Sequence, residues 1–243
     1  MTEVTTEVTI VPVERLELAF APRPWPFATE RRAEIDAHFA AVRQAKPALW
    51  NGRVLMLYQH TIGDAVFRGS YFETDFASML AWRHWNFPDA GVKNCFAMGA
   101  LRASDGAFLL GVMGEHTSNP GFVYFPAGLP DTSDIDGSRV DLTRNVMREI
   151  GEETGLTPDH FEADDGWITV LAGPRIAQIK MLRAHGTAVE LRKRVLGFIE
   201  QEAEPELSDI RIVRGPADLD AMMPPFVAAF LTHIWNGPAE RGS

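Results

Sequence analysis

The clearest pattern of apolar and polar positions in the chain lies between Asp141 and Thr154. Apolar residues one helical turn apart form a single stripe there: Leu142, Val146 and Ile150. The segment has no proline and few β-branched residues, which favours a helix. Gly155 suits the position after the last helical residue, and Pro158 blocks an extension. We therefore predict a helix over residues 141–154, with Asp141 at its N-cap.

Apolar patterns on both sides of this segment predict further elements. Helices are expected at residues 29–44, 75–85, 187–202 and 225–235. Strands are expected at residues 8–11, 16–18, 53–58, 66–72, 95–102, 108–114, 122–125, 167–171, 176–182 and 210–213. Strands mixed with helices predict an α/β protein, an α/β/α sandwich around a mixed sheet. We expect residues 1–88 to form an N-terminal α/β extension and residues 89–243 the main domain.

Three carboxylates converge at the end of the 141–154 helix. Glu149, Glu152 and Glu153 are spaced i, i+3, i+4, so their side chains share one turn. Like charges at these spacings destabilise a helix by roughly 0.2–0.5 kcal/mol per pair. The negative end of the helix dipole also disfavours them. A bound cation explains this arrangement better than a solvated acidic helix end, and Mg²⁺ is the cation that prefers carboxylate oxygens and bridges to phosphates.

The residues around these glutamates resemble a known motif. Arg148-Glu-Ile-Gly-Glu-Glu-Thr-Gly-Leu156 resembles the second half of the Nudix box, Gly-x5-Glu-x7-Arg-Glu-U-x-Glu-Glu-x-Gly-U, where U is a bulky aliphatic residue. Phe125-Pro-Ala-Gly128 is similar to the strand end and glycine loop that open the box. Gly128 lies 20 residues before Arg148, whereas the family pattern has 14, so the loop from Leu129 to Val140 carries six extra residues.

The extra residues displace the first glutamate of the motif. Counting back from Arg148 puts Val140 at its position. Asp136 and Asp141 are our candidates to replace it. The aspartates of this loop do not have the register of a calcium-binding loop, so the segment itself is expected to be a solvated, turn-rich insertion.

The resemblance implies a Nudix hydrolase with the fold predicted above. Its expected catalytic residues are Arg148, Glu149, Glu152 and Glu153. The three glutamates, helped by the Gly128 carbonyl, would hold Mg²⁺ or Mn²⁺, and Arg148 would orient them. The expected reaction is hydrolysis of the diphosphate linkage in a nucleoside diphosphate joined to another moiety. Which glutamate takes the proton of the attacking water stays open.

The sequence says less about which substrate is bound. The layout of residues 1–88 loosely resembles the region before the box in Nudix enzymes that hydrolyse UDP-sugars, but ADP-ribose, dinucleotides and coenzyme A derivatives stay open as substrates. Arg175 follows a strand end at a turn, from where a guanidinium can bind a phosphate. It is our candidate substrate-binding residue, with a paired surface arginine as the equal alternative. A further catalytic carboxylate is expected after the box, among Glu200, Glu202, Glu204 and Glu206.

Charge and cysteine content limit the partners and the compartment. The net charge is −10, and no block of Lys or Arg is present, which disfavours duplex nucleic acid. No segment has the length and composition of a membrane span. One cysteine, Cys95, fits a reducing compartment, so a cytoplasmic location is expected. Two other function classes stay open: a non-catalytic Nudix-like module that binds a nucleotide, and an interaction domain, including a homodimer.

Overall fold

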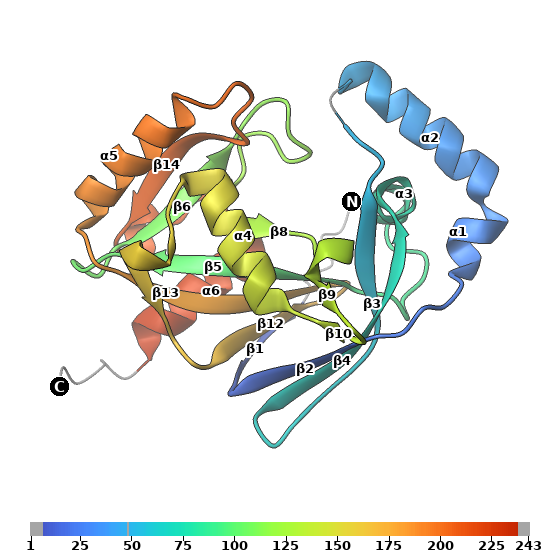
Figure 1. Ribbon diagram of the computed structural model, residues 1–243, viewed down its shortest axis with the longest axis horizontal. Helices are drawn as coiled ribbons and strands as arrows, with labels where there is room; N and C mark the ends of the chain where they lie inside the picture. Colours follow the sequence, from blue (N-terminus) through green and yellow to red (C-terminus); the bar gives the residue numbers. More distant parts are fainter. Residues whose placement is uncertain (1–6, 48, 238–243) are drawn as a thin grey trace.

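The computed structural model describes residues 7–47 and 49–237, which form two β-sheets with helices packed against them (Figure 1). The larger sheet contains, in order, β1 (Val8–Val13), β12 (Trp167–Ala172), β13 (Arg175–Ala184), β5 (Asn94–Arg102), β6 (Phe108–Met113) and β14 (Leu207–Val213). Three short strands, β11 (Phe161–Ala163), β7 (Val123–Tyr124) and β8 (Ala127–Gly128), pair with β13, β6 and β5. The sheet is mixed, because β13 and β5 are parallel and their other neighbours are antiparallel.

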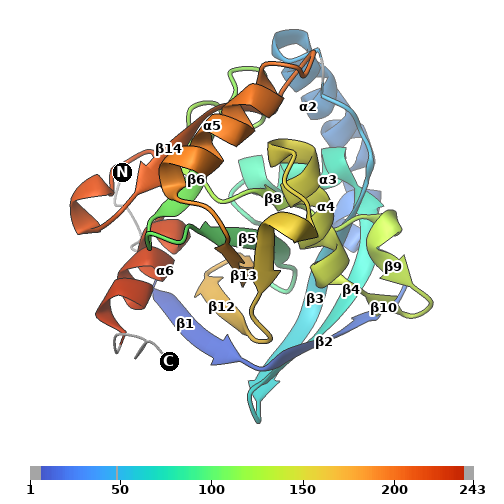
Figure 2. The ribbon, with the colours of Figure 1, turned by 60° about the vertical axis from the view of Figure 1, so that its left-hand side comes forward.

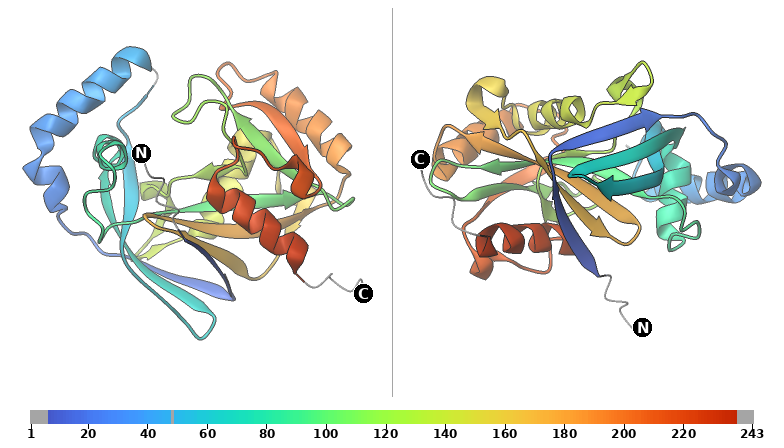
Figure 3. Two further views of the ribbon diagram at one scale, coloured as in Figure 1. Left: turned by 180° about the vertical axis from the view of Figure 1, so that it is seen from behind. Right: turned by 90° about the horizontal axis from the view of Figure 1, so that it is seen from below.

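Helices cover both faces of the larger sheet. Successive side chains of a strand point to opposite faces, and in β5 Cys95 and Ala97 belong to one buried cluster while Phe96 and Met98 belong to another. The first cluster includes residues of α4 (Leu142–Thr154) and α5 (Ala188–Ile199), and the second includes residues of α6 (Pro225–Asn236). Figure 3 shows α6 on the face opposite α4 and α5. The predicted α/β/α sandwich around a mixed sheet is confirmed.

The smaller sheet carries most of the N-terminal segment. Its strands are, in order, β3 (Arg53–Gly63), β4 (Val66–Asp75), β2 (Arg15–Phe20), β10 (Arg139–Val140) and β9 (Ile135–Asp136). The same segment contains three helices: α1 (Pro26–Glu30) and α2 (Arg32–Ala45) between β2 and β3, and α3 (Phe76–His84) after β4. A separate core of large aromatic side chains, including Trp25, Phe72 and Trp82, lies between β3, β4 and α3. The predicted α/β extension is therefore folded around its own apolar residues.

Strands cross between the two sheets in both directions. β1 pairs with β12 of the larger sheet, and after the single residue Glu14 the chain enters β2 of the smaller sheet. In the other direction, β9 and β10 follow β8 of the larger sheet but pair with β2. The division into residues 1–88 and 89–243 stays a prediction, and the strand pairing shows that the two parts share their sheets.

The insertion before α4 has a regular structure. A 3₁₀ turn, η1 (Thr132–Asp134), leads into a short hairpin of β9 and β10, which lies beside β2 (Figure 2). Arg139 pairs with Ala19, and the Phe20 N–H donates to the Ser138 carbonyl at 2.8 Å. Much of the insertion is exposed and it contains turns, as expected, but it is not a loop throughout, because β9 and β10 complete the edge of the smaller sheet.

Helix α4 has the limits that the sequence predicts. The Asp141 carboxylate caps it by accepting from the Arg144 N–H at 3.0 Å, and Gly155 ends it with a φ of 66°. Ile150 packs directly on β5, where a Cβ on Gly99 would come within 2.8 Å of its side chain. A glycine at position 99 thus lets α4 approach the sheet. Within residues 7–47 and 49–237, no helix is both long and apolar enough to cross a membrane.

Candidate active site

Arg148 lies at the centre of a group of carboxylates. Its Nη1 lies 2.7 Å from Glu149 Oε1 and 3.2 Å from Glu152 Oε2. The Glu152 contact follows from helix geometry, because residues four apart share a face. Its Nη2 lies 3.2 Å from Asp134 Oδ2, which comes from η1. Charge-assisted bonds from one guanidinium thus fix the directions of three acids.

Asp134 is the acid that the sequence analysis missed. It has no exposed surface, and its Oδ2 accepts from the Asp131 N–H and Asn145 Nδ2, both at 3.0 Å, as well as from Arg148. The spacing Gly-x5-Glu, counted forward from Gly128, ends at residue 134. Counting back from Arg148 missed it because the six extra residues lie between Asp134 and Arg148.

The two acids proposed in its place have other positions. Asp136 is an exposed residue of β9. Asp141 is the N-cap residue of α4, and its carboxylate accepts from a backbone N–H of that helix. Among the described ion pairs of Arg148, the acids are Asp131, Asp134, Glu149 and Glu152. Asp136 and Asp141 are not among these acids, whereas Asp134, at the position that the spacing from Gly128 gives, pairs with Arg148. That Asp136 or Asp141 takes the place of the first motif glutamate stays a prediction that this geometry does not favour.

Glu153 is buried against the strand that opens the motif. Only 6% of the residue is exposed, and its Oε1 accepts from the Ala127 N–H of β8 at 3.1 Å. Its Oε2 is buried and has no hydrogen-bond partner among the described residues. Burial raises the pKa of this carboxyl well above its ordinary value, although the Ala127 N–H opposes the shift. A buried carboxylate oxygen without a hydrogen-bond partner is costly, because it has lost its hydration.

Glu149 lies against Gly128, and its side chain is 12% exposed. A Cβ on Gly128 would come within 1.9 Å of Glu149 Oε1, so any side chain there would displace the carboxylate. Burial raises the pKa of Glu149 to about 7, a shift that Arg148 opposes and that Glu152, Glu206 and Asp134 reinforce. The site therefore holds more negative charge than its own cation neutralises.

Glu206 belongs to the same group. It precedes β14 and is exposed, and its charge raises the pKa values of both Glu149 and Glu153. The Gly114 N–H donates to its carbonyl at 2.8 Å, which fixes the segment next to the loop after β6. Of the four downstream glutamates considered, Glu206 is the one whose charge acts on both buried glutamates. The sequence offered the candidates but not the choice, because it depends on how β14 pairs with β6.

These residues are compatible with a divalent cation. Carboxylate oxygens are the ligands that Mg²⁺ prefers. Glu153 Oε2 has no partner among the described residues, and Glu149 lies close to Gly128, so several acidic oxygens gather here with little positive charge to balance them. Over the described part of the chain, no three His, Cys, Asp or Glu side chains are already arranged around a common metal position. The reason is visible in the contacts: Arg148 holds Glu149 and Glu152, and Ala127 holds Glu153.

Arg175 is the first residue of β13 and pairs in register with Asn94 of β5. Its guanidinium carbon lies 5.0 Å from the centre of the Phe87 ring, and it forms no ion pair with any described residue. Burial lowers its pKa. Among the described residues nothing supports the alternative that Arg175 is a paired surface arginine, and substrate binding stays a prediction.

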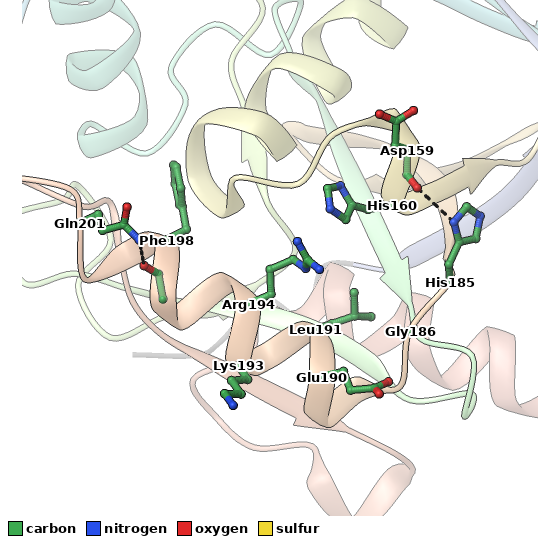
Figure 4. A pocket seen from close by; sticks show the side chains of 11 residues that line it. Asp159, His160, His185, Gly186, Glu190, Leu191, Lys193, Arg194, Phe198 and Gln201 are labelled. Atoms are coloured by element: carbon green, nitrogen blue, oxygen red, sulfur yellow. Dashed lines mark hydrogen bonds between the residues drawn. The ribbon is translucent and has the colours of Figure 1, made fainter.

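A separate open hollow of about 840 Å³ lies along α5. Figure 4 shows its lining by residues of α5, such as Leu191, Arg194 and Phe198, and by His160 and His185 from the loops beyond α4 and β13. None of the residues that gather around Arg148 lines it. The hollow is therefore distinct from the carboxylate site.

Several solved structures, most of them described as Nudix hydrolases, match part of this chain at low identity. One from M. smegmatis, RenU, covers 58% of this chain and 81% of its own at 14% identity, with a TM-score of 0.38. The MutT protein from Methanosarcina mazei Go1 covers 58% and 91% at 18% identity, with a TM-score of 0.37. A Nudix hydrolase from Nitrosomonas europaea covers 59% and 90% at 14% identity, with a TM-score of 0.39. Neither a protein-family model nor a curated protein matches the sequence. At these values, function has to be inferred from the residues of the site.

Proposed function

We propose that this chain is a Nudix hydrolase that cleaves the diphosphate linkage of a nucleoside diphosphate joined to another moiety, such as a sugar. The proposal depends mainly on one observation. Glu153 is buried and the Glu149 side chain is only 12% exposed, the pKa values of both are raised, and the Glu153 Oε2 atom has no partner among the described residues. Such an arrangement is costly without a cation, because a buried, unpaired carboxylate loses its hydration.

The residues that would hold Mg²⁺ or Mn²⁺ are Glu149, Glu152 and Glu153, with the Gly128 carbonyl. When bound, such an ion neutralises the negative charge of a diphosphate and lowers the pKa of a water molecule. Arg148 keeps Glu149 and Glu152 directed to one side of α4, and Asp134 keeps Arg148 in place. Glu206 is exposed, and its charge acts on both Glu149 and Glu153, which supports it as the further carboxylate expected after the motif.

A cytoplasmic location is part of the proposal. It is supported by Cys95, which is free and buried rather than part of a disulfide. The substrate is a small anionic molecule, which the net charge of −10 favours over duplex nucleic acid.

The test is a panel of nucleotide sugars, ADP-ribose, dinucleotides and coenzyme A derivatives, with mononucleotide release as the readout. We expect release from at least one compound with Mg²⁺ or Mn²⁺ and none after exhaustive EDTA treatment. Glu152→Gln should remove most of the rate, whereas Glu162→Gln, an exposed glutamate of β11, is the charge-matched control. Turnover that survives EDTA would refute the proposal. Tight nucleotide binding with no release would favour the non-catalytic module instead.

A further inference from the structure

Two half-buried arginines lie near the carboxylate site without any acid partner among the described residues. Arg83 is in the last turn of α3, and Arg175 begins β13. The side chain of Arg83 has one described hydrogen bond, a long one of 3.4 Å from Nη1 to Asn119 Oδ1. The Arg175 guanidinium contacts the face of the Phe87 ring. In a protein with a net charge of −10, acidic side chains are abundant, so two arginines without an acidic partner among the described residues require an explanation.

Packed aromatic rings connect the segments that carry the two arginines. The Phe87 ring, which contacts Arg175, packs edge-on against Trp82 with 4.8 Å between ring centres, and Trp82 precedes Arg83 in the chain. The Phe87 N–H also donates to the Trp82 carbonyl at 2.9 Å, which fixes the turn after α3. Burial lowers the pKa of Arg83, and the charge of Arg175 lowers it further. The arginines therefore repel each other at a site with reduced hydration.

Asn119 and Tyr124 connect this pair to the glutamates. The Asn119 Nδ2 atom donates to the Tyr124 hydroxyl at 3.4 Å while its Oδ1 accepts from Arg83. Burial raises the pKa of Tyr124 to about 12, and the nearby charges of Glu153 and Glu206 act in the same direction. Tyr124 thus bonds to the asparagine that Arg83 contacts, and it lies three residues before Ala127, whose N–H donates to Glu153. In Figure 1, the loop after β6 that carries Asn119 extends toward α2 and α3.

The guanidinium groups remain accessible to a ligand. Both arginines are of intermediate exposure, and none of their side-chain nitrogens is among the fully buried, unbonded polar atoms of the described residues. Arginine presents a planar fork of donors that matches phosphate oxygens, and its charge is lost only at very high pH. An anion between the two would relieve their repulsion and restore the lost solvation.

We propose that Arg83 and Arg175, with the Asn119 amide beside them, form a subsite for a phosphate group of the substrate. The proposal depends on the proposed function only for the identity of that substrate. One phosphate would lie on the carboxylate side of Tyr124 and the second on the arginine side, which makes a diphosphate the chemical class that fits. Arg83 comes from the N-terminal segment, so that segment would contribute directly to substrate binding.

The test measures binding of inorganic pyrophosphate to the full chain in EDTA, so that neither metal nor turnover is involved. We expect saturable binding that Arg83→Gln and Arg175→Gln each weaken about tenfold, which corresponds to ~1.4 kcal/mol. Arg31→Gln is the matched control: Arg31 also contacts an aromatic ring, that of Trp85, but it has an acid partner in Glu34. Its affinity should equal that of the wild type. Absence of saturable binding, or equal affinity in all four proteins, would overturn the subsite.

Two further measurements separate a lost site from a lost fold and from the proposed function. Removing a repelled cation should leave the thermal midpoint unchanged or slightly higher. If a glutamine variant does not fold, Arg83→Lys and Arg175→Lys keep the charge without the fork and should weaken pyrophosphate binding severalfold. Mg²⁺-dependent hydrolysis with the same KM in Arg83→Gln and the wild type would keep the function and refute the subsite. Arginine-dependent pyrophosphate binding without hydrolysis of any compound would refute the function and keep the subsite.

Discussion

Replacing Asp134 tests the central structural claim about the site. Asp134 Oδ2 accepts three hydrogen bonds, from the Asp131 N–H, Asn145 Nδ2 and Arg148 Nη2, and the residue is fully buried. Asp134→Ala leaves all three donors unpaired. Removing one partner of a buried ion pair costs about 3–5 kcal/mol. For a chain of this length, 1 kcal/mol shifts the midpoint by roughly 2–4 °C, so we expect a loss of about 6–20 °C.

Asp134→Asn separates charge from shape. The amide oxygen can still accept the three bonds, so the expected cost falls to about 1–2 kcal/mol, the difference between a charged and a neutral acceptor. Arg148 would then be held less firmly, and loss of a residue that orients metal ligands typically costs 10–100-fold in metal affinity or activity. Urea denaturation in EDTA measures the first effect, and the Mg²⁺-dependent hydrolysis rate measures the second.

Asp136→Asn is the control, because Asp136 is an exposed residue of the same insertion. It should leave both stability and rate unchanged. Full stability and full rate in Asp134→Asn, together with a loss in Asp136→Asn, would refute the assignment and restore the candidate proposed from the sequence.

Three further predictions follow from the burial of charge at α4. Glu153→Gln should abolish most hydrolysis while the thermal midpoint in EDTA holds or rises, because the substitution removes a buried charge; full activity would contradict the metal-ligand role. The pKa of Glu149 is raised to about 7, so its contribution to stability is complete below about pH 4.5 and is lost as the pH rises through 7. In EDTA the wild type should lose on the order of 3 kcal/mol over that range relative to Glu149→Gln, measured by urea denaturation, and parallel curves would contradict the shift. Asp141→Ser should keep the cap and the activity, whereas Asp141→Ala should cost ~1 kcal/mol of unfolding free energy with normal turnover, and a large activity loss in Asp141→Ser would indicate a catalytic role.

The elements that could be predicted are those whose determinants are local. The limits of α4 follow from Asp141 and Gly155, and its buried side follows from the apolar stripe, all within one segment. The six long strands of the larger sheet were predicted for the same reason, since apolar runs such as β5 are buried on both faces, whereas the short strands β8 and β11 were not predicted. These features need no knowledge of partners distant in the sequence.

The features that were missed depend on partners distant in the sequence. Strands β9 and β10 have two residues each, too short for any pattern, and they form because β2 offers them an edge. Asp134 could not be matched to Arg148 by spacing, because the six extra residues of the insertion lie between these two residues. Arg83 showed no signal at all, because its site is made by α3, the loop after β6 and the start of β13.

The insertion and the N-terminal segment are therefore parts of one arrangement around the site. The extra residues follow Asp134, so the spacing from Gly128 to the acid is kept while the hairpin pairs with β2. A longer loop costs little closure entropy, and here its backbone bonds to Phe20 and Ala19 hold the turn that carries Asp134. The N-terminal segment thus reaches the site at two places, through β2 to the acid that holds Arg148 and through α3 to Arg83. Because β10 pairs with β2, we expect substitutions in the N-terminal segment to alter the position of Asp134, and with it the carboxylate site, from outside the motif.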